Sequence, residues 1–226
     1  MNPRFSKFDR LCHFFVKPVK FQGKSSYLAN RMNVQSLDTS SKKAAILQAV
    51  LELIGENGFH GVPMSQVAKN AGVAAGTIYH YFESKDSLIR ELCALIKSRM
   101  ADEMFSQEFE RLDFRERFFK GWIRLCQFFI NNKHSLTFIQ QYNNSPYAKQ
   151  QVCEPVSPFG QKFEAFLKTG TDEGYIKDLE YNLVAAIVFG CIMTTAKFHL
   201  EGRHKYSEDD LTKIASIIWD GIKLPD

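Results

Sequence analysis

The chain has 226 residues, 24% of them charged, with a formal net charge of +4, and this length allows one large or two small hydrophobic cores. Its five cysteines lie far apart without a C-x-x-C spacing, which argues against a zinc site or a redox pair and indicates reduced thiols of a cytoplasmic protein. The most apolar run, residues 183–196, is shorter than the ~18 residues that suggest a membrane span, so it predicts a buried helix and no membrane partner.

Residues 1–38 form a basic extension with seven Lys or Arg and two Asp or Glu. Its aromatic residues fall at helical spacing, so one interpretation is an amphipathic helix on a membrane or a nucleic acid. The interpretation that we favour is a disordered segment or a mis-assigned start, with translation beginning at Met32. The net charge falls to +2 over residues 39–100 and to −3 over residues 101–226, so a polyanion is expected to bind the N-terminal half.

Four helices are predicted between Ser41 and Arg99. Gly58 ends the first helix, because glycine accepts a left-handed backbone, and Pro63 suits the first turn of the second. Gly72 supplies the turn between the second and third helices, which together form a helix-turn-helix whose shape fits the major groove of B-DNA. Apolar residues at helical spacing are Ile46, Ala49, Val50, Leu53 and Ile54 in the first helix, Met64, Val67, Ala68 and Ala71 in the second, Val73, Ile78 and Phe82 in the third, and Leu88, Leu92, Leu95 and Ile96 in the fourth.

Every regular segment beyond Met100 also has a helical pattern, and no alternating strand pattern or internal repeat occurs. Ser207 and Asp210 have the spacing of a capping box at the start of the last helix. The predicted fold class is therefore all-α with about nine or ten helices, in which residues 39–86 form the helix-turn-helix domain and residues 87–226 a larger helical domain. The helices expected beyond Met100 span 102–110, 114–131, 134–143, 157–173, 179–201 and 207–223.

The stretch from Gly72 to Leu88, GVAAGTIYHYFESKDSL, resembles the tetracycline-repressor (TetR) family of bacterial transcription regulators. Its A-G-V, G-T-(aliphatic)-Y, Y-F and S-K elements occur in one frame behind a long first helix. The resemblance implies a homodimer in which the N-terminal domain binds operator DNA, while the larger domain binds a small-molecule effector and forms the dimer. Two recognition helices about one DNA turn, ~34 Å, apart would match a palindromic operator.

The resemblance, carried over residue by residue, places DNA contacts on the second and third helices and near the start of the first and fourth. Hydroxyl groups can bind phosphate, and methyl or ring surfaces can pack on thymine. The chain has Ala74-Ala75 where the family often has Ser-Lys, which removes a cap oxygen and a cation and predicts a shallower salt dependence of binding. Val62 likewise replaces the usual Thr cap before the second helix. The expected DNA-binding residues are Lys43, Ser65, Gln66, Ala75, Gly76, Thr77, Tyr79, His80, Tyr81 and Lys85.

Alternative roles exist for several of these residues. The aromatic residues of the third helix could be core residues, which suits Phe82 and in part Tyr81, and Lys85 could be an ordinary solvated lysine. His80 has no second His at a metal-ligand spacing, and His199 and His204 do not share a helix face, so no metal site is expected and these histidines are structural or solvent-exposed.

The larger domain is rich in aromatic residues, which suits either a tight core or a cavity for an apolar or planar ligand. The expected ligand-binding residues are Trp122, Leu125, Phe129, Phe138, Tyr142, Phe159, Phe163 and Met193. The last two helices have more apolar residues than one buried face requires, so they are expected to form a four-helix seam between two chains. The expected dimer-interface residues are Leu183, Ile187, Cys191, Thr195, Leu211, Ile214, Ile218 and Ile222.

The leading hypothesis is a ligand-controlled repressor, in which effector binding favours a dimer whose recognition helices are spaced wrongly for the two half-sites of the operator. A second hypothesis is an interaction protein with a degenerate helix-turn-helix that does not bind DNA, because Ala74-Ala75 lacks the usual cap and cation. An enzyme is the third, although the sequence has no H-E-x-x-H, G-x-S-x-G or phosphate-binding glycine motif. No cofactor is expected.

Overall fold

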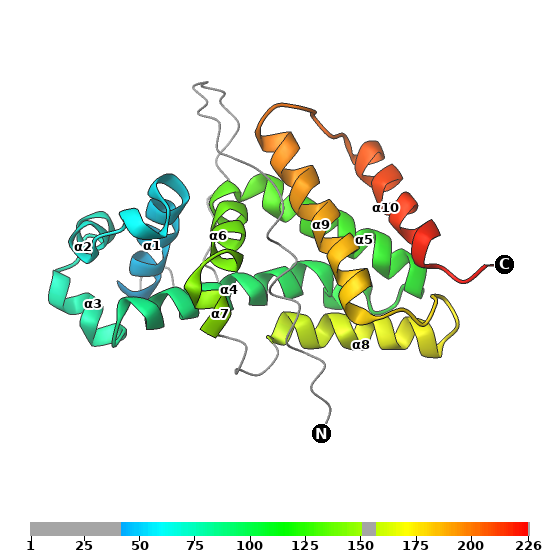
Figure 1. Cartoon of the computed structure of the whole chain (residues 1–226), viewed down its shortest axis with the longest axis horizontal. Coiled ribbons are helices and arrows are strands. Elements are labelled where there is room, and N and C mark those ends of the chain that lie inside the picture. Colours follow the sequence, from blue (N-terminus) through cyan, green and yellow to red (C-terminus); the bar gives the residue numbers. More distant parts are fainter. Residues whose placement is uncertain (1–41, 151–156, 226) are drawn as a thin grey trace. The chain divides into compact units, whose positions relative to one another are not determined.

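The computed structural model describes residues 42–150 and 157–225, and the regular structure within these ranges is helical (Figure 1). The all-α prediction and the predicted number of helices are confirmed for this part of the chain. The predicted basic extension, residues 1–38, lies outside the described residues. The helices in chain order are α1 (Lys42–Asn57), η2 (Phe59–Gly61), α2 (Met64–Ala71), α3 (Ala75–Tyr81), α4 (Lys85–Met104), η3 (Gln107–Phe109), α5 (Phe114–Asn131), α6 (Lys133–Asn143), α7 (Pro146–Gln150), α8 (Pro158–Asp172), α9 (Tyr181–Leu200) and α10 (Glu208–Ile222).

The described helices belong to two compact units. The helix-turn-helix unit comprises residues 42–95 and 131–150, and the C-terminal unit comprises residues 96–130 and 157–225. Because α6 and α7 belong to the helix-turn-helix unit, this division differs from the boundary at residue 86 that we predicted from the sequence. The helix α4 contributes its first half to one unit and its second half to the other.

The helix-turn-helix unit forms around α1, whose apolar stripe packs inward as predicted. Eight residues of α1 are buried, among them Ile46, Val50 and Ile54. Gly72 ends α2 with φ 65°, a left-handed conformation that a side chain would disfavour, and it turns the chain toward α3. The inward residues of α3 and its end are Ile78 and Phe82, which are 0% and 3% exposed. The local signals of the sequence therefore specify α1, α2 and α3 correctly.

The helix α6 packs closely on α1 within the same unit. A Cβ atom added at Gly55 of α1 would overlap the ring of His134 in α6, so the two helix backbones approach through this glycine. Phe59, just after α1, contacts rings of α6 and α7, with its centroid 5.5 Å from both Phe138 and Tyr147. These contacts explain why α6 and α7, distant in sequence, join the helix-turn-helix unit.

The C-terminal unit has a core of packed aromatic rings. Phe114 of α5 stacks on Phe166 of α8 with centroids 4.5 Å apart, and Phe163 of α8 lies 4.8 Å from Phe189 of α9. Trp219 of α10 lies 5.5 Å from Phe118. The rings join helices α5, α8, α9 and α10, and they account for much of the apolar surface that this unit buries.

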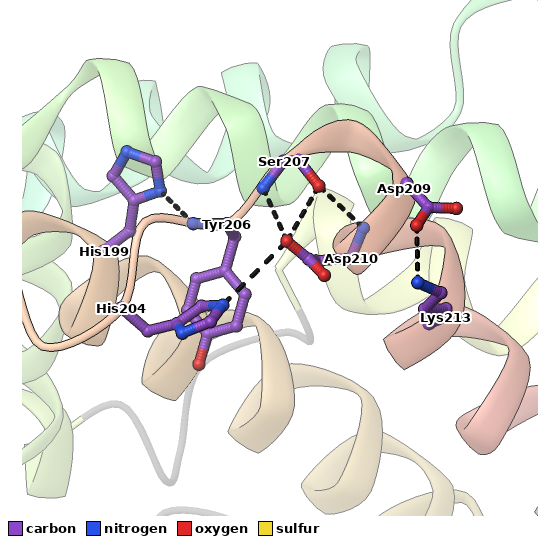
Figure 2. Close-up of polar contacts among 7 residues, drawn as sticks. All are labelled: His199, His204, Tyr206, Ser207, Asp209, Asp210 and Lys213. Atoms are coloured by element: carbon purple, nitrogen blue, oxygen red, sulfur yellow. Dashed lines mark hydrogen bonds and ion pairs between the residues drawn. The ribbon is translucent and has the colours of Figure 1, made fainter.

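The helices α9 and α10 lie side by side (Figure 1). Their connection is fixed by contacts among His199, His204, Tyr206, Ser207 and Asp210, which we call the polar lock. Figure 2 shows that His199 Nδ1 accepts a hydrogen bond from the backbone N–H of Tyr206, at 3.2 Å. The Tyr206 ring packs against His204 with centroids 4.5 Å apart. Ser207 and Asp210 form the predicted capping box, since the Asp210 N–H donates to Ser207 Oγ and the Ser207 N–H donates to Asp210 Oδ2. His199 therefore has the structural role that the sequence suggested.

Acidification is expected to weaken this polar lock. Burial, Lys205 and His204 all lower the pKa of His199 below its usual value, because each disfavours the charged ring. The neutral ring accepts the Tyr206 N–H, whereas a ring protonated at Nδ1 cannot. His199 therefore stabilises the fold at pH values above its unfolded-state pKa of about 6.5, and this contribution is lost as the pH falls through the lower folded-state pKa.

Urea unfolding at about pH 7.5 and about pH 5 measures this contribution. The expected loss from His199 is at most about 1 kcal/mol, the size of one hydrogen bond, because the ring is partly exposed. The control is His199→Asn, whose side-chain oxygen can accept the Tyr206 N–H but does not titrate. His134, whose pKa is also lowered by burial and by Lys133, is present in both proteins and cancels in the comparison. Equal acid sensitivity of wild type and variant would contradict the assignment.

Candidate nucleic-acid interface

The outer face of α3 is exposed over the segment that the sequence assigned to DNA contact. Tyr79 is 56% exposed and Tyr81 is 40% exposed, so both rings present large surfaces to solvent. Ala75, Gly76 and His80 are exposed and Thr77 is half-buried. Since Ile78 is the one buried residue of α3, it fixes the helix to the unit and leaves the other side chains available to a partner. Tyr79 is therefore not a core aromatic residue, whereas Tyr81 is partly covered and Phe82 is buried, as the alternative interpretation had it.

The neighbouring helix α2 adds a polar surface to the same helix-turn-helix. Ser65 and Gln66 are exposed, as a DNA-contacting role requires, and line an open hollow of about 470 Å³ with Lys69 and Asn70. Neither α2 nor α3 has a side chain capping its first turn, because the N-cap residues are Pro63 and Ala74. The cap side chains that the sequence lacks are therefore also missing from the first turns of α2 and α3 in the structure.

The two lysines that the sequence assigned to phosphate both have partners inside the unit. Lys43 forms an ion pair with Glu91 at 2.5 Å, and its Nζ lies 5.5 Å from the centre of the Phe82 ring. Lys85 Nζ donates to the backbone carbonyls of Phe59 and Val62, at 3.1 and 3.0 Å. Lys85 is therefore not the ordinary solvated lysine of our alternative interpretation. Lys43 is ion-paired, whereas both acceptors of Lys85 are neutral carbonyls.

The expected ligand-binding residues do not share one unit. Phe138 and Tyr142 lie in the helix-turn-helix unit, where their rings pack at 5.8 Å from each other and beside Phe59. The sequence grouped them with α5 because helical periodicity shows an apolar face and not the helix that covers it. The other six lie in the C-terminal unit: Trp122, Leu125, Phe129, Phe159 and Phe163 are buried, and Met193 is half-buried.

The expected dimer residues separate into an exposed set and a buried set. On α9, Leu183 and Ile187 are 56% and 51% exposed, and Cys191 is half-buried. On α10, Ile214 is half-buried, while the most exposed apolar residue is Ile217 at 73%. The dimer assignment was wrong for the four residues that pack inside the protomer, which are Thr195, Leu211, Ile218 and Ile222.

The sequence pattern could not separate these four buried residues from the exposed ones, because α9 and α10 are both apolar on more than one side. A periodic pattern identifies the faces of such a helix but does not indicate which face the rest of the chain covers. In α9, which by length and a mean hydropathy of 1.8 is also a candidate membrane span among the described residues, one third of the apolar window is buried. Leu183 and Ile187 lie one turn apart on its uncovered side.

Comparisons with known proteins match both parts of the chain. The profile of "Bacterial regulatory proteins, tetR family" matches residues 46–92, and that of "Tetracyclin repressor-like, C-terminal domain" matches residues 94–224. The "Fatty acid metabolism regulator protein" of Bacillus subtilis (strain 168) is 28% identical over 171 residues, which is 73% of this chain and 87% of the relative.

Solved structures have the same fold. A TetR family transcription regulator from Marinobacter aquaeolei VT8 superposes with a TM-score of 0.73 at 19% identity, covering 80% of this chain and 95% of that one. The transcriptional regulator FadR from Bacillus subtilis, solved in complex with stearoyl-CoA, gives a TM-score of 0.64 at 24% identity, covering 78% and 95%. With both family profiles matched and the outer face of α3 exposed, the chain belongs to the TetR family of bacterial regulatory proteins and is a DNA-binding transcription regulator.

Proposed function

We propose that two copies of this chain bind a palindromic operator through α2 and α3 and repress transcription. The observation that carries the DNA-binding part is the exposed face of α3, where Thr77, Tyr79 and His80 surround a single buried anchor, Ile78. Tyr79 is 56% exposed in the protomer, so much of its apolar ring surface is in contact with water. Exposed apolar surface of this kind is typical of a site that a binding partner covers. Tyrosine offers ring surface to thymine and a hydroxyl to phosphate.

The exposed apolar residues of α9 and α10 support the dimer. Leu183, Ile187 and Ile217 are each more than half exposed, on two neighbouring helices that already form part of the core of the C-terminal unit. A second copy that presents the same surface would cover these residues by a twofold symmetric contact. The two recognition helices would then face successive grooves of one duplex.

We further propose a fatty acyl-CoA as the effector, bound in the C-terminal unit. Its apolar, ring-rich interior suits an acyl chain, and Trp122, Phe129 and Phe163 are among the buried residues there. The named relative of Bacillus subtilis regulates fatty acid metabolism, and a structural neighbour was solved with stearoyl-CoA. Effector binding would favour a dimer in which the two recognition helices have a different spacing. The operator would then be released because the effector site and the DNA site are coupled.

A binding assay with operator DNA tests the proposal. Duplexes selected from a random-sequence pool by the wild-type protein would be titrated in an electrophoretic shift, with and without stearoyl-CoA. Tyr79→Ala is expected to lower the affinity by about tenfold or more per half-site, since a hydrogen bond and ring packing are lost. Lys120→Ala, which shortens an exposed residue of α5 outside the helix-turn-helix unit, is the control and should bind as wild type. Failure to enrich any sequence would refute operator binding, and persistence of the shift at saturating stearoyl-CoA would refute the effector.

A further inference from the structure

The indole N–H of Trp122 is an unpaired hydrogen-bond donor inside the C-terminal unit. Trp122 lies in α5 with an exposed fraction of 0%, and its Nε1 has no hydrogen-bond partner among the described residues. Most buried polar groups in proteins have such a partner, because a donor that leaves water without gaining an acceptor costs free energy. The position of this donor is therefore unfavourable for the unliganded protein, and an acceptor on a ligand would relieve it.

The surroundings of Trp122 offer no acceptor side chain. No Asp, Glu, Asn or Gln is buried in the described part of this unit. Thr195 of α9 is the one buried hydroxyl residue there, and it makes no hydrogen bond with the indole. Phe118 and Cys126, one turn before and one turn after Trp122, are 1% and 0% exposed. The donor therefore faces an apolar interior.

The same part of α5 disfavours a negative charge. Burial raises the pKa of the Cys126 thiol to about 12, because the thiolate would lose its hydration. Cys126 and Trp122 are four residues apart and share a helix face. A partner that satisfies the indole N–H is therefore expected to be a neutral acceptor, such as a carbonyl oxygen, and not a carboxylate.

Arg117 has the other buried donor of α5 that lacks a partner among the described residues, its Nε. Its guanidinium carbon lies 5.7 Å from the centre of the Phe114 ring and 5.9 Å from that of Phe166, and the side chain is half-buried. An arginine has four further N–H donors, whereas a tryptophan side chain has only one. Trp122 is therefore the residue whose hydrogen bonding depends most on a ligand.

We propose that the indole N–H of Trp122 donates a hydrogen bond to the thioester carbonyl oxygen of the fatty acyl-CoA effector. This oxygen is neutral and lies at the end of the acyl chain, so it satisfies the donor while the chain contacts the apolar interior. The carboxylate of a free fatty acid would instead bring a charge into these surroundings. Trp122 thus selects acyl thioesters. The inference rests on the proposed acyl-CoA effector.

Calorimetric titration of the full-length protein with two ligands tests this role. The ligands are stearoyl-CoA and octadecyl-CoA thioether, which has the same chain length but a CH₂ group in place of the carbonyl. The wild type is expected to bind stearoyl-CoA about tenfold more tightly, because the thioether cannot accept the indole N–H. Trp122→Phe keeps an aromatic ring but has no donor, so it is expected to bind the two ligands with equal affinity.

Trp219→Phe is the matched control. It makes the same change at a residue of α10 that is 6% exposed in the same unit, and it should keep the tenfold preference for stearoyl-CoA. Because the chain has two tryptophans, this variant also leaves Trp122 as the only one. A hydrogen bond at the indole N–H lowers the energy of the excited ring, so stearoyl-CoA should shift the emission to longer wavelength than the thioether does.

The wild-type and Trp219→Phe measurements leave Trp122 in place, so they decide the question even if Trp122→Phe does not fold. Equal affinity of the wild type for the two ligands would overturn the inference. A preference for stearoyl-CoA that survives in a folded Trp122→Phe protein would overturn it as well. If the wild type binds neither ligand, the proposed acyl-CoA effector itself fails, so the two failures are distinguishable.

Discussion

Glutamate in place of both Ile187 and Ile217 is expected to convert the protein to a monomer and to lower operator affinity by a factor on the order of 10³. The two side chains are 51% and 73% exposed in the protomer, so the substitutions disturb little of the core packing. In a twofold dimer each change occurs twice, which places four carboxylates in an apolar seam where burial of unpaired charge is costly. A monomer contacts one half-site and loses the advantage of two linked contacts.

Sedimentation or light scattering would report the mass, and an electrophoretic shift the affinity for the selected duplex. The control is Ala165→Glu, which adds one carboxylate per chain at an exposed position of α8 in the same unit. It should leave mass and affinity unchanged. A double variant that remains dimeric would show that the seam lies elsewhere, and a monomer with full operator affinity would show that operator binding does not need two copies.

Gly121→Ala is expected to destabilise the C-terminal unit by about 1–3 kcal/mol. Gly121 is buried in α5, and a Cβ atom there would overlap the backbone carbonyl oxygen of Met104 in α4. A backbone atom cannot rotate away, so the two helices must separate and disturb contacts of neighbours such as Trp122, which is 0% exposed. The better helix propensity of alanine returns roughly 1 kcal/mol, and the overlap outweighs it.

Thermal unfolding measures this effect, with an expected fall in Tm of about 2–4 °C for each kcal/mol. Gly76→Ala is the matched control, since nothing lies within 4 Å of a Cβ atom added at that helical position. That control should be neutral or slightly stabilising. A Gly121→Ala protein as stable as wild type would mean that α4 and α5 are farther apart than described.

Part of the candidate site could be predicted from the sequence because its signals are local. Gly72 needs a left-handed backbone, Ile78 marks the inward face of α3, and the G-T-I-Y-H-Y run lies in one frame with both, so the exposure of Tyr79 and His80 follows. The same local logic identified the capping box of Ser207 before α10. The two hydrogen bonds of Lys85 could not be predicted in this way, because their acceptors are carbonyls 23 and 26 residues earlier.

The sequence by itself determined the all-α class, the helix-turn-helix and the exposed face of its third helix, because turn glycines and helical periodicity act over a few residues. Only the tertiary structure decided which face of α10 is covered, so that Ile218 is buried while Ile217 is exposed. It also decided that α6 packs on α1 and takes Phe138 away from the aromatic core of the C-terminal unit. Burial depends on which distant segments meet, and a periodic pattern carries no information about its partner.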